Sequence, residues 1–163
     1  MKKNIYIISL VVLILDQIIK YYILSSTLII KAITIIPDFF SLRFVKNYGA
    51  AWGIFQDKTF FLTIISGLTL ILINKYLLNE KRFNKISIIS YGLLIGGILG
   101  NFFDRIVHGF VIDYLDFTIF KYDFPVFNLA DMAIVIGIIL MFVEVVRIEI
   151  NENNRRVRRK IKN

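Results

Sequence analysis

Four long apolar segments constrain the fold of this chain more than any other feature. A helix needs roughly 20 mostly apolar residues to cross the hydrocarbon core of a bilayer. Segments of this kind lie at residues 4–24, 59–78, 86–106 and 130–148. They predict an all-α membrane protein with four transmembrane helices, in which residues 1–163 form a single domain.

The composition agrees with a membrane protein and excludes several kinds of site. The chain is 57% hydrophobic, above the roughly 45–50% of soluble domains. Its net charge of +8 comes from basic residues that lie between and after the apolar segments, so we expect no nucleic-acid partner. The chain has no cysteine and a single histidine, His108. Disulfides, a thiolate nucleophile and a multi-histidine metal site are therefore excluded, and we predict no metal and no cofactor.

Two regions between the apolar segments should lie outside the membrane. Residues 25–58 combine β-branched side chains with Pro37 and Gly49, a mixture typical of short strands and turns. Residues 107–129 contain three acids among many aromatic side chains, which favour a membrane interface. We predict a small extracytoplasmic β-cradle at 25–58 and an interfacial loop at 107–129.

Basic residues predict the orientation in the membrane. They precede the first segment, lie at 75–85 between the second and third, and fill the tail at 149–163. Such residues favour the cytoplasmic side, so both termini should be cytoplasmic and both extramembrane regions should lie on the outer face. The first segment resembles a secretory signal, but no small-residue cleavage site follows it. We therefore predict an uncleaved helix.

Several polar residues in or beside the apolar segments need an explanation. An ionisable residue at the centre of a membrane helix costs roughly 2.5–3.5 kcal/mol on insertion scales. Asp16 and Lys20 are four residues apart and can form an ion pair, which leaves a purely structural role open. In KNYGAAWG, Asn47 precedes small residues that would allow another backbone or an extended peptide to approach closely. A plain turn is the structural alternative.

The third apolar segment ends in GGILGNFFDR, where polar residues follow three glycines. Asn101 shares a helical face with Asp104 and with Arg105, whereas these two neighbours in sequence must find different partners. Glycine-mediated helix packing with a snorkelling Arg105 is the structural alternative, and it is compatible with a binding role.

Acidic residues recur in VIDYLDF and FNLAD, just before the fourth apolar segment. Asn128 as a helix N-cap would place Asp131 at the third helical position, where capping alone could account for it. Capping does not account for Asp113. Two acids held together near a low-dielectric boundary share a proton, and such a pair can activate water and protonate a leaving amine.

Taken together and in this order, DQIIK, NYGAAWG, GGILGNFFDR, VIDYLDF and FPVFNLAD resemble the lipoprotein signal peptidase family, also called signal peptidase II. The resemblance covers essentially the whole chain. It implies four transmembrane helices with a β-cradle and a periplasmic-type half-helix loop. It also implies an aspartic endopeptidase of the bacterial membrane that cleaves prolipoproteins on the N-terminal side of a diacylglyceryl-modified cysteine.

The same resemblance implies roles for individual residues. The catalytic pair matches Asp113 and Asp131 rather than Asp104 or Asp116. The family's substrate-contacting positions match Asn47, Asn101 and Arg105. Positions that support the site match Asp16 and Asn128. Expected partners are a diacylglyceryl-prolipoprotein, membrane lipid and the inhibitor globomycin, and we expect a monomer.

Two other functions fit part of the pattern. A proton-coupled carrier would also need membrane carboxylates, but its sites usually lie near the bilayer midplane on broken helices. A scaffold without catalysis would use the acids only as caps and for interfacial solvation. Zinc or serine chemistry is disfavoured, because the chain lacks the ligand clusters and the GxSxG turn that these need.

Overall fold

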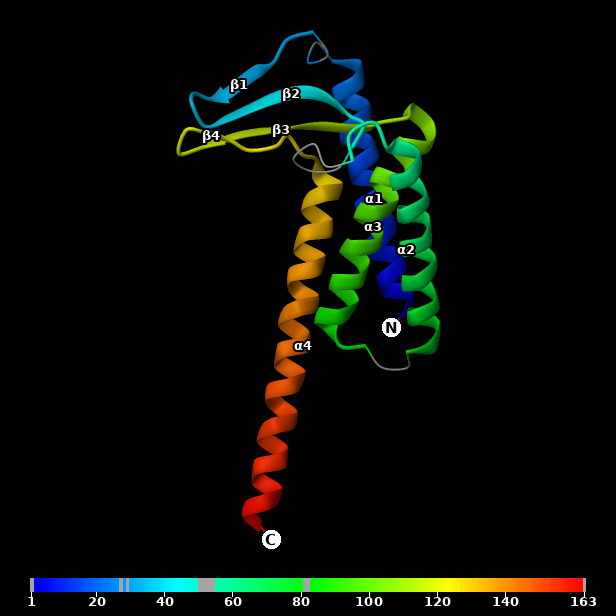
Figure 1. The fold of residues 1–163 in the computed structure, drawn as a ribbon, viewed down its shortest axis with the longest axis vertical. Helices are drawn as coiled ribbons and strands as arrows, with labels where there is room; N and C mark the ends of the chain where they lie inside the picture. Colours follow the sequence, from blue (N-terminus) through cyan, green and yellow to red (C-terminus); the bar gives the residue numbers. More distant parts are fainter. Residues whose placement is uncertain (1, 27, 29, 50–54, 81–82, 163) are drawn as a thin grey trace.

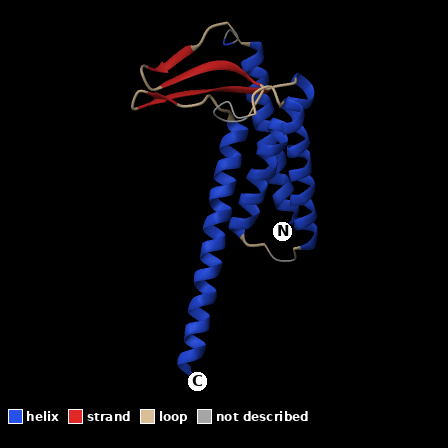
Figure 2. Cartoon of the chain, viewed as in Figure 1, coloured by secondary structure: helices blue, strands red, loops and turns tan. Residues whose placement is uncertain are grey.

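The computed structural model describes residues 2–26, 28, 30–49, 55–80 and 83–162. Helices and strands follow in the order α1 (Lys2–Ser25), β1 (Ile33–Ile36), β2 (Phe40–Asn47), α2 (Thr59–Asn79), α3 (Lys85–His108), β3 (Val111–Ile119), β4 (Tyr122–Asp123) and α4 (Leu129–Lys162). The helices run side by side, and the strands form a sheet across one end of them (Figures 1 and 2). Both termini lie at the other end (Figure 1).

The predicted helices are confirmed. In the described part of the chain, four helices are long and apolar enough to cross a membrane. Their ends agree with the predicted ranges to within two residues, except for the end of the fourth helix. Instead of ending at residue 148, α4 continues through the basic region to Lys162, because residues 149–162 contain no glycine or proline to stop it.

Helix α3 lies at the centre of the bundle and contacts each of the other three helices. Two of its glycines explain how closely they approach. A Cβ atom at Gly96 would lie 2.6 Å from Cβ of Val12 on α1, and one at Gly97 would lie 2.8 Å from Cγ1 of Ile134 on α4. The predicted glycine-mediated packing is therefore present, and it brings the polar end of α3 against both neighbours.

The sheet is larger than the sequence predicted. It is antiparallel with strand order β1-β2-β3-β4, so half of its strands come from residues 107–129, where we had expected only an interfacial loop. Strand β3 begins buried, and its Ile112 and Tyr114 pack with Ile23 of α1 and with Leu28. The pairing partner of β3 lies about 70 residues earlier in the chain, and local sequence patterns do not reveal it.

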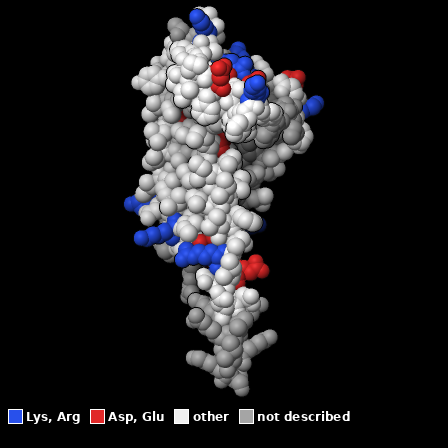
Figure 3. All heavy atoms as spheres, turned by 90° about the vertical axis from the view of Figure 1, so that its left-hand side faces the viewer, with Lys and Arg blue, Asp and Glu red and all other residues white. Residues whose placement is uncertain are grey.

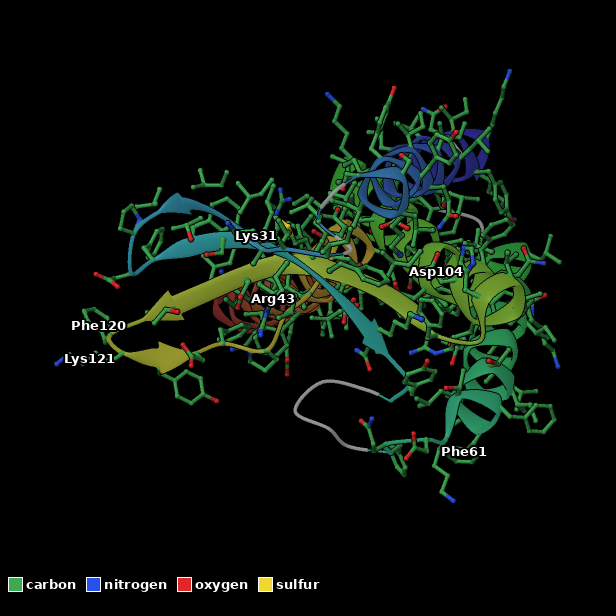
Figure 4. The ribbon with its side chains drawn as sticks, turned by 90° about the horizontal axis from the view of Figure 1, so that it is seen from above. Lys31, Arg43, Phe61, Asp104, Phe120 and Lys121 are labelled. Carbon is green, nitrogen blue, oxygen red and sulfur yellow. The ribbon has the colours of Figure 1, made fainter. Side chains whose placement is uncertain are left out.

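Seen from above, the sheet projects sideways from the helix ends (Figure 4). Phe120 and Lys121 form the tip of its last hairpin, while Asp104 lies among the helices (Figure 4). Between the ends of the long helices, the described parts of the two extramembrane regions contain strands and turns but no further α-helix. Residues 50–54, which include the AAWG part of the glycine-alanine motif, lie outside the described residues, so the half-helix loop stays a prediction.

Candidate active site

Most of the predicted site residues line one cavity beneath the sheet, whereas the two expected to support the site, Asp16 and Asn128, do not line it. The cavity has a volume of about 590 Å³, and its walls are mainly apolar. Its polar and charged lining comes from the sheet, from α2, from the end of α3 and from the start of α4: Asn47, Ser66, Asn101, Arg105, Asp113 and Asp131. An apolar cavity with a few convergent polar groups is the usual form of a binding or catalytic site.

Asp113 is held on the sheet by two side-chain amides. In the β2–β3 register Val45 lies opposite Asp113, so Asn47 is a diagonal neighbour on the same face. The Asn47 amide donates to Oδ2 of Asp113 at 2.8 Å, and the Asn128 amide donates to Oδ1 at 2.7 Å. The carboxyl group is only 1% exposed, so these two amides replace its water.

Asp131 takes part in the predicted helix cap. Its backbone N–H donates to Oδ1 of Asn128 at 2.9 Å, and the backbone N–H of Asn128 donates to Oδ2 of Asp131 at 3.1 Å. This reciprocal capping confirms the N-cap prediction. The other oxygen, Oδ1, accepts from the Asn101 amide at 2.7 Å. Asn128 thus bridges the two aspartates, with its amide on Asp113 and its cap on Asp131.

The surroundings of Asp113 favour its protonated form. Burial raises the pKa of Asp113, the negative charge of Asp131 raises it further, and the hydrogen bonds from Asn47 and Asn128 lower it in part. The result is a pKa of about 7. Because two interacting acids titrate as a unit, the pair can hold one shared proton near neutral pH.

Arg105 supplies a donor to the same cavity. Its guanidinium reaches two backbone carbonyls, with Nη1 3.4 Å from the oxygen of Asn101 and Nη2 3.3 Å from that of Gly49. Its Nε–H is buried and has no hydrogen-bond partner among the described residues. Leaving a buried donor unpaired costs free energy, so this group is available to a ligand carbonyl.

A buried ion network lies directly behind the cavity. Lys20 is 1% exposed, and its Nζ lies 2.8 Å from Oδ2 of Asp16 and 2.8 Å from Oδ2 of Asp104. The predicted Asp16–Lys20 pair is therefore present, and Asp104 shares the same lysine. Lys20 also donates to Oδ1 of Asn101 at 3.1 Å, which turns the NH₂ group of Asn101 towards Asp131.

The network also braces the neighbouring elements. Oδ1 of Asp16 accepts from the backbone N–H of Ala130 at 3.0 Å, in the first turn of α4. Asp104 accepts from the Gln17 amide at 2.9 Å and from the backbone N–H of Ile112 at 3.1 Å. As predicted, Asp104 and Arg105 find different partners.

Sequence reasoning missed the contributions of Gln17 and Lys20 to the site. The four-residue spacing of Lys20 from Asp16 signalled a pair, but no pattern indicated that Asp104 and Asn101 would join it. Asp116 lies elsewhere, in a partly exposed ion pair of 2.9 Å with Arg43 on the sheet. Neither Asp104 nor Asp116 lines the cavity.

Comparison with known proteins places this site in a family. The family model described as signal peptidase (SPase) II matches residues 8–147. The chain belongs to the signal peptidase II family. The lipoprotein signal peptidase of Staphylococcus aureus (strain bovine RF122 / ET3-1) is 37% identical over 152 residues, which are 93% of each chain. The corresponding protein of strain Newman is also 37% identical over the same share.

Solved structures of two bacterial membrane enzymes share the fold. One, at 2.3 Å resolution, has a TM-score of 0.81 and 36% identity over 89% of this chain and 88% of its own. The other, at 1.9 Å resolution, has a TM-score of 0.78 and 37% identity over 88% of this chain and 92% of its own. As a member of the signal peptidase II family, the chain is an aspartic peptidase of the bacterial membrane, and neither a carrier nor an inert scaffold.

Proposed function

We propose that Asp113 and Asp131 are the catalytic pair with which this signal peptidase II cleaves a prolipoprotein just before its diacylglyceryl-modified cysteine. The observation that carries the assignment is the convergence of both carboxyl groups on one cavity, where Asn128 connects them. Asp104 has a cationic partner in Lys20, and Asp116 has one in Arg43. Asp113, in contrast, accepts its hydrogen bonds from two neutral amides.

The chemistry follows from one proton shared by two acids. The ionised aspartate takes a proton from a water molecule while the oxygen of that water attacks the scissile carbonyl carbon. The protonated aspartate donates its proton to the carbonyl oxygen, which gives a tetrahedral diol. When the C–N bond breaks, the aspartate that took the water proton gives it to the leaving amine, and one hydroxyl of the diol gives its proton to the other aspartate as the carboxylic acid forms. The pair therefore holds one proton before and after the reaction. A pKa of about 7 for Asp113 suits a group that must both hold and release a proton.

The remaining polar groups would position the peptide. Nε–H of Arg105 is available to a peptide carbonyl, and the amides of Asn47 and Asn101 hold the two carboxyl groups in place. Fixing an extended peptide in this way lowers the entropic part of the barrier. Met132, Val135 and Ile136 line the cavity on α4 and are at least 40% exposed on the lipid side. They offer an apolar route for a lipid-anchored substrate.

The distribution of charge supports an outer-face site. On the face shown in Figure 3, a mainly uncharged band separates charged side chains at the sheet end from a mostly basic group lower on the bundle. We propose that this lower end is cytoplasmic, with both termini, and that the sheet and cavity lie on the outer face. We further propose that the enzyme works as a monomer in contact with membrane lipid, that globomycin occupies the cavity, and that nucleic acid is no partner.

A gel-shift cleavage assay on a synthetic diacylglyceryl-prolipoprotein in nanodiscs tests the assignment. We expect Asp113→Asn and Asp131→Asn each to lower the cleavage rate by about 100-fold or more. Asp116→Asn is the matched control, because it removes the same charge from the same strand outside the cavity. Near-normal cleavage by either active-site variant would refute the assignment. Globomycin should inhibit the wild type and the control variant alike.

A further inference from the structure

A second cavity lies at the opposite end of the bundle from the proposed catalytic pair. Its volume is about 470 Å³, and it is formed where α2 ends, α3 begins and α4 passes both. Its lining combines two carboxylates, three aromatic rings and several smaller side chains: Tyr76, Glu80, Phe83, Asn84, Ser87, Tyr91, Met141, Glu144, Val145 and Ile148.

Glu144 is the least expected member of this lining. It is an acidic residue within a candidate membrane span, and it is only 6% exposed. One oxygen, Oε1, accepts a hydrogen bond from the Asn84 amide. The other, Oε2, is buried and accepts no hydrogen bond from the described residues. Nη1 of Arg147 is 3.8 Å from Oε2, beyond hydrogen-bond range, and the Arg147 side chain is 61% exposed. A buried carboxylate oxygen in this state needs a donor.

Aromatic rings beside the two carboxylates indicate what kind of donor fits. The ring centroids of Tyr76 and Tyr91 are 5.7 Å apart, and those of Phe83 and Tyr91 are 6.1 Å apart at nearly a right angle. Aromatic faces with an adjacent carboxylate are the typical environment of an ammonium group. A metal ion is less suitable, because the described residues contain no group of three or more acidic, histidine or cysteine ligands.

The position of the cavity indicates where the ammonium group comes from. The candidate membrane spans of α2, α3 and α4 end or begin near it, at Asn79, Lys85 and Asn151. This is the depth of lipid head groups, where tyrosines are enriched. Basic side chains gather on this part of the surface (Figure 3), and Arg147 is among the residues beside the cavity. A lipid that carries an ammonium group next to a phosphate would match both charges.

We propose that this second cavity binds the head group of an amino-phospholipid. The ammonium group donates to Oε2 of Glu144 and packs against the rings of Tyr76 and Tyr91, with Glu80 as the second carboxylate. The exposed guanidinium of Arg147 meets the lipid phosphate. The acyl chains then lie along α4, whose exposed side chains from Met132 to Val146 are apolar. The site is distinct from the proposed catalytic cavity and depends on no part of the proposed reaction.

Native mass spectrometry of the purified full chain tests the proposal. Phosphatidylethanolamine and phosphatidylglycerol with identical acyl chains are added in turn, and the bound fraction of each is measured. We expect phosphatidylethanolamine to bind more strongly. Glu144→Gln should weaken its binding by roughly tenfold, the effect of losing one charge-assisted hydrogen bond, and leave phosphatidylglycerol unchanged. Glu149→Gln is the matched control, since Glu149 is exposed on the same helix.

Further arms identify the source of the ammonium group and guard against misfolding. If free ethanolamine displaces the lipid, the cavity recognises the ammonium group alone. If it does not, binding also needs the acyl chains of the lipid. Both results support an ammonium site. Tyr76→Leu replaces a half-exposed ring and should reduce the lipid preference even if Glu144→Gln fails to fold. Equal binding of the two lipids by the wild type, or binding of Mg²⁺ at Glu144 in place of the amine, would overturn the proposal.

Discussion

Two pairs of aspartates, buried except for the partly buried Asp131, lie at the sheet end of the bundle and differ in what stands between them. Asp16 and Asp104 share the ammonium group of Lys20, at 2.8 Å from each. Asp113 and Asp131 are connected by neutral amides, chiefly that of Asn128. The central cation compensates the negative charges of Asp16 and Asp104, so this pair can stabilise the fold in its ionised form. Amides offset the charge of a carboxyl group only in part, so burial and mutual repulsion favour one proton on the second pair.

The comparison also explains why the two pairs are neighbours. Lys20 touches Asn101, and Asn101 touches Asp131, so the compensated pair fixes the donor that orients the uncompensated one. Rigid support behind a reactive group keeps that group in the position that the reaction requires. If this view is correct, changes in the two pairs should have different consequences.

The largest difference should appear when each pair loses one charge. We expect Asp113→Asn to lower the cleavage rate by about 100-fold or more and to lower the unfolding temperature less than Asp104→Asn, because the loss of one amide hydrogen bond is offset by the removal of repulsion from Asp131. Asp104→Asn should lower the unfolding temperature, because it breaks a buried ion network. Cleavage assays and thermal unfolding in detergent measure the two effects. Equal loss of stability in both variants would remove the distinction between the pairs.

Removal of the central cation should have the next largest effect. Lys20→Met leaves Asp16 and Asp104 buried without compensation, which should cost about 3–5 kcal/mol of unfolding free energy. The control is Lys75→Met, at an exposed position on α2. Thermal unfolding compares the two variants. A Lys20→Met protein as stable as the control would mean that water or a lipid head group already compensates the acids.

The dependence on pH should follow the shared proton. Above a pH of about 7 Asp113 loses its proton, so the cleavage rate should fall by about tenfold per pH unit. Because the folded pKa of Asp113 is raised, the folded state binds the extra proton between about pH 4 and 7, and stability should decline with rising pH across that window. Asp113→Asn should abolish that decline, whereas Asp116→Asn should keep it. A flat wild-type rate from pH 6 to 9 would contradict a shared proton.

The smallest effects should come from the amides. Asn128→Ala removes a helix cap and should cost about 1–2 kcal/mol, while Asn47→Ala removes no cap and should cost less. Both amides lower the pKa of Asp113, so both changes should move the alkaline fall in rate to higher pH. Rate profiles and thermal unfolding of the two variants separate capping from proton control. A shift to lower pH in either variant would contradict the view that its amide stabilises the ionised form of the pair.

Much of the fold could be read from local patterns. Stretches of apolar residues located all four helices, since crossing a bilayer requires a fixed length of satisfied backbone. The spacing of Asp16 and Lys20 indicated their ion pair, and the position of Asn128 indicated a helix cap. Each of these depends on residues within one or two turns of each other, so the chain alone contains the information.

The sequence by itself therefore determined the membrane class, the helices, the cap at Asn128 and, through the order of its motifs, the family. Tertiary structure alone decided the extension of the sheet by β3 and β4, the sharing of Lys20 with Asp104, and the amide bridge between Asp113 and Asp131. The physical reason is separation along the chain. Strand register and the close approach of α3 to α1 and α4 set these contacts, and neither can be deduced from local periodicity.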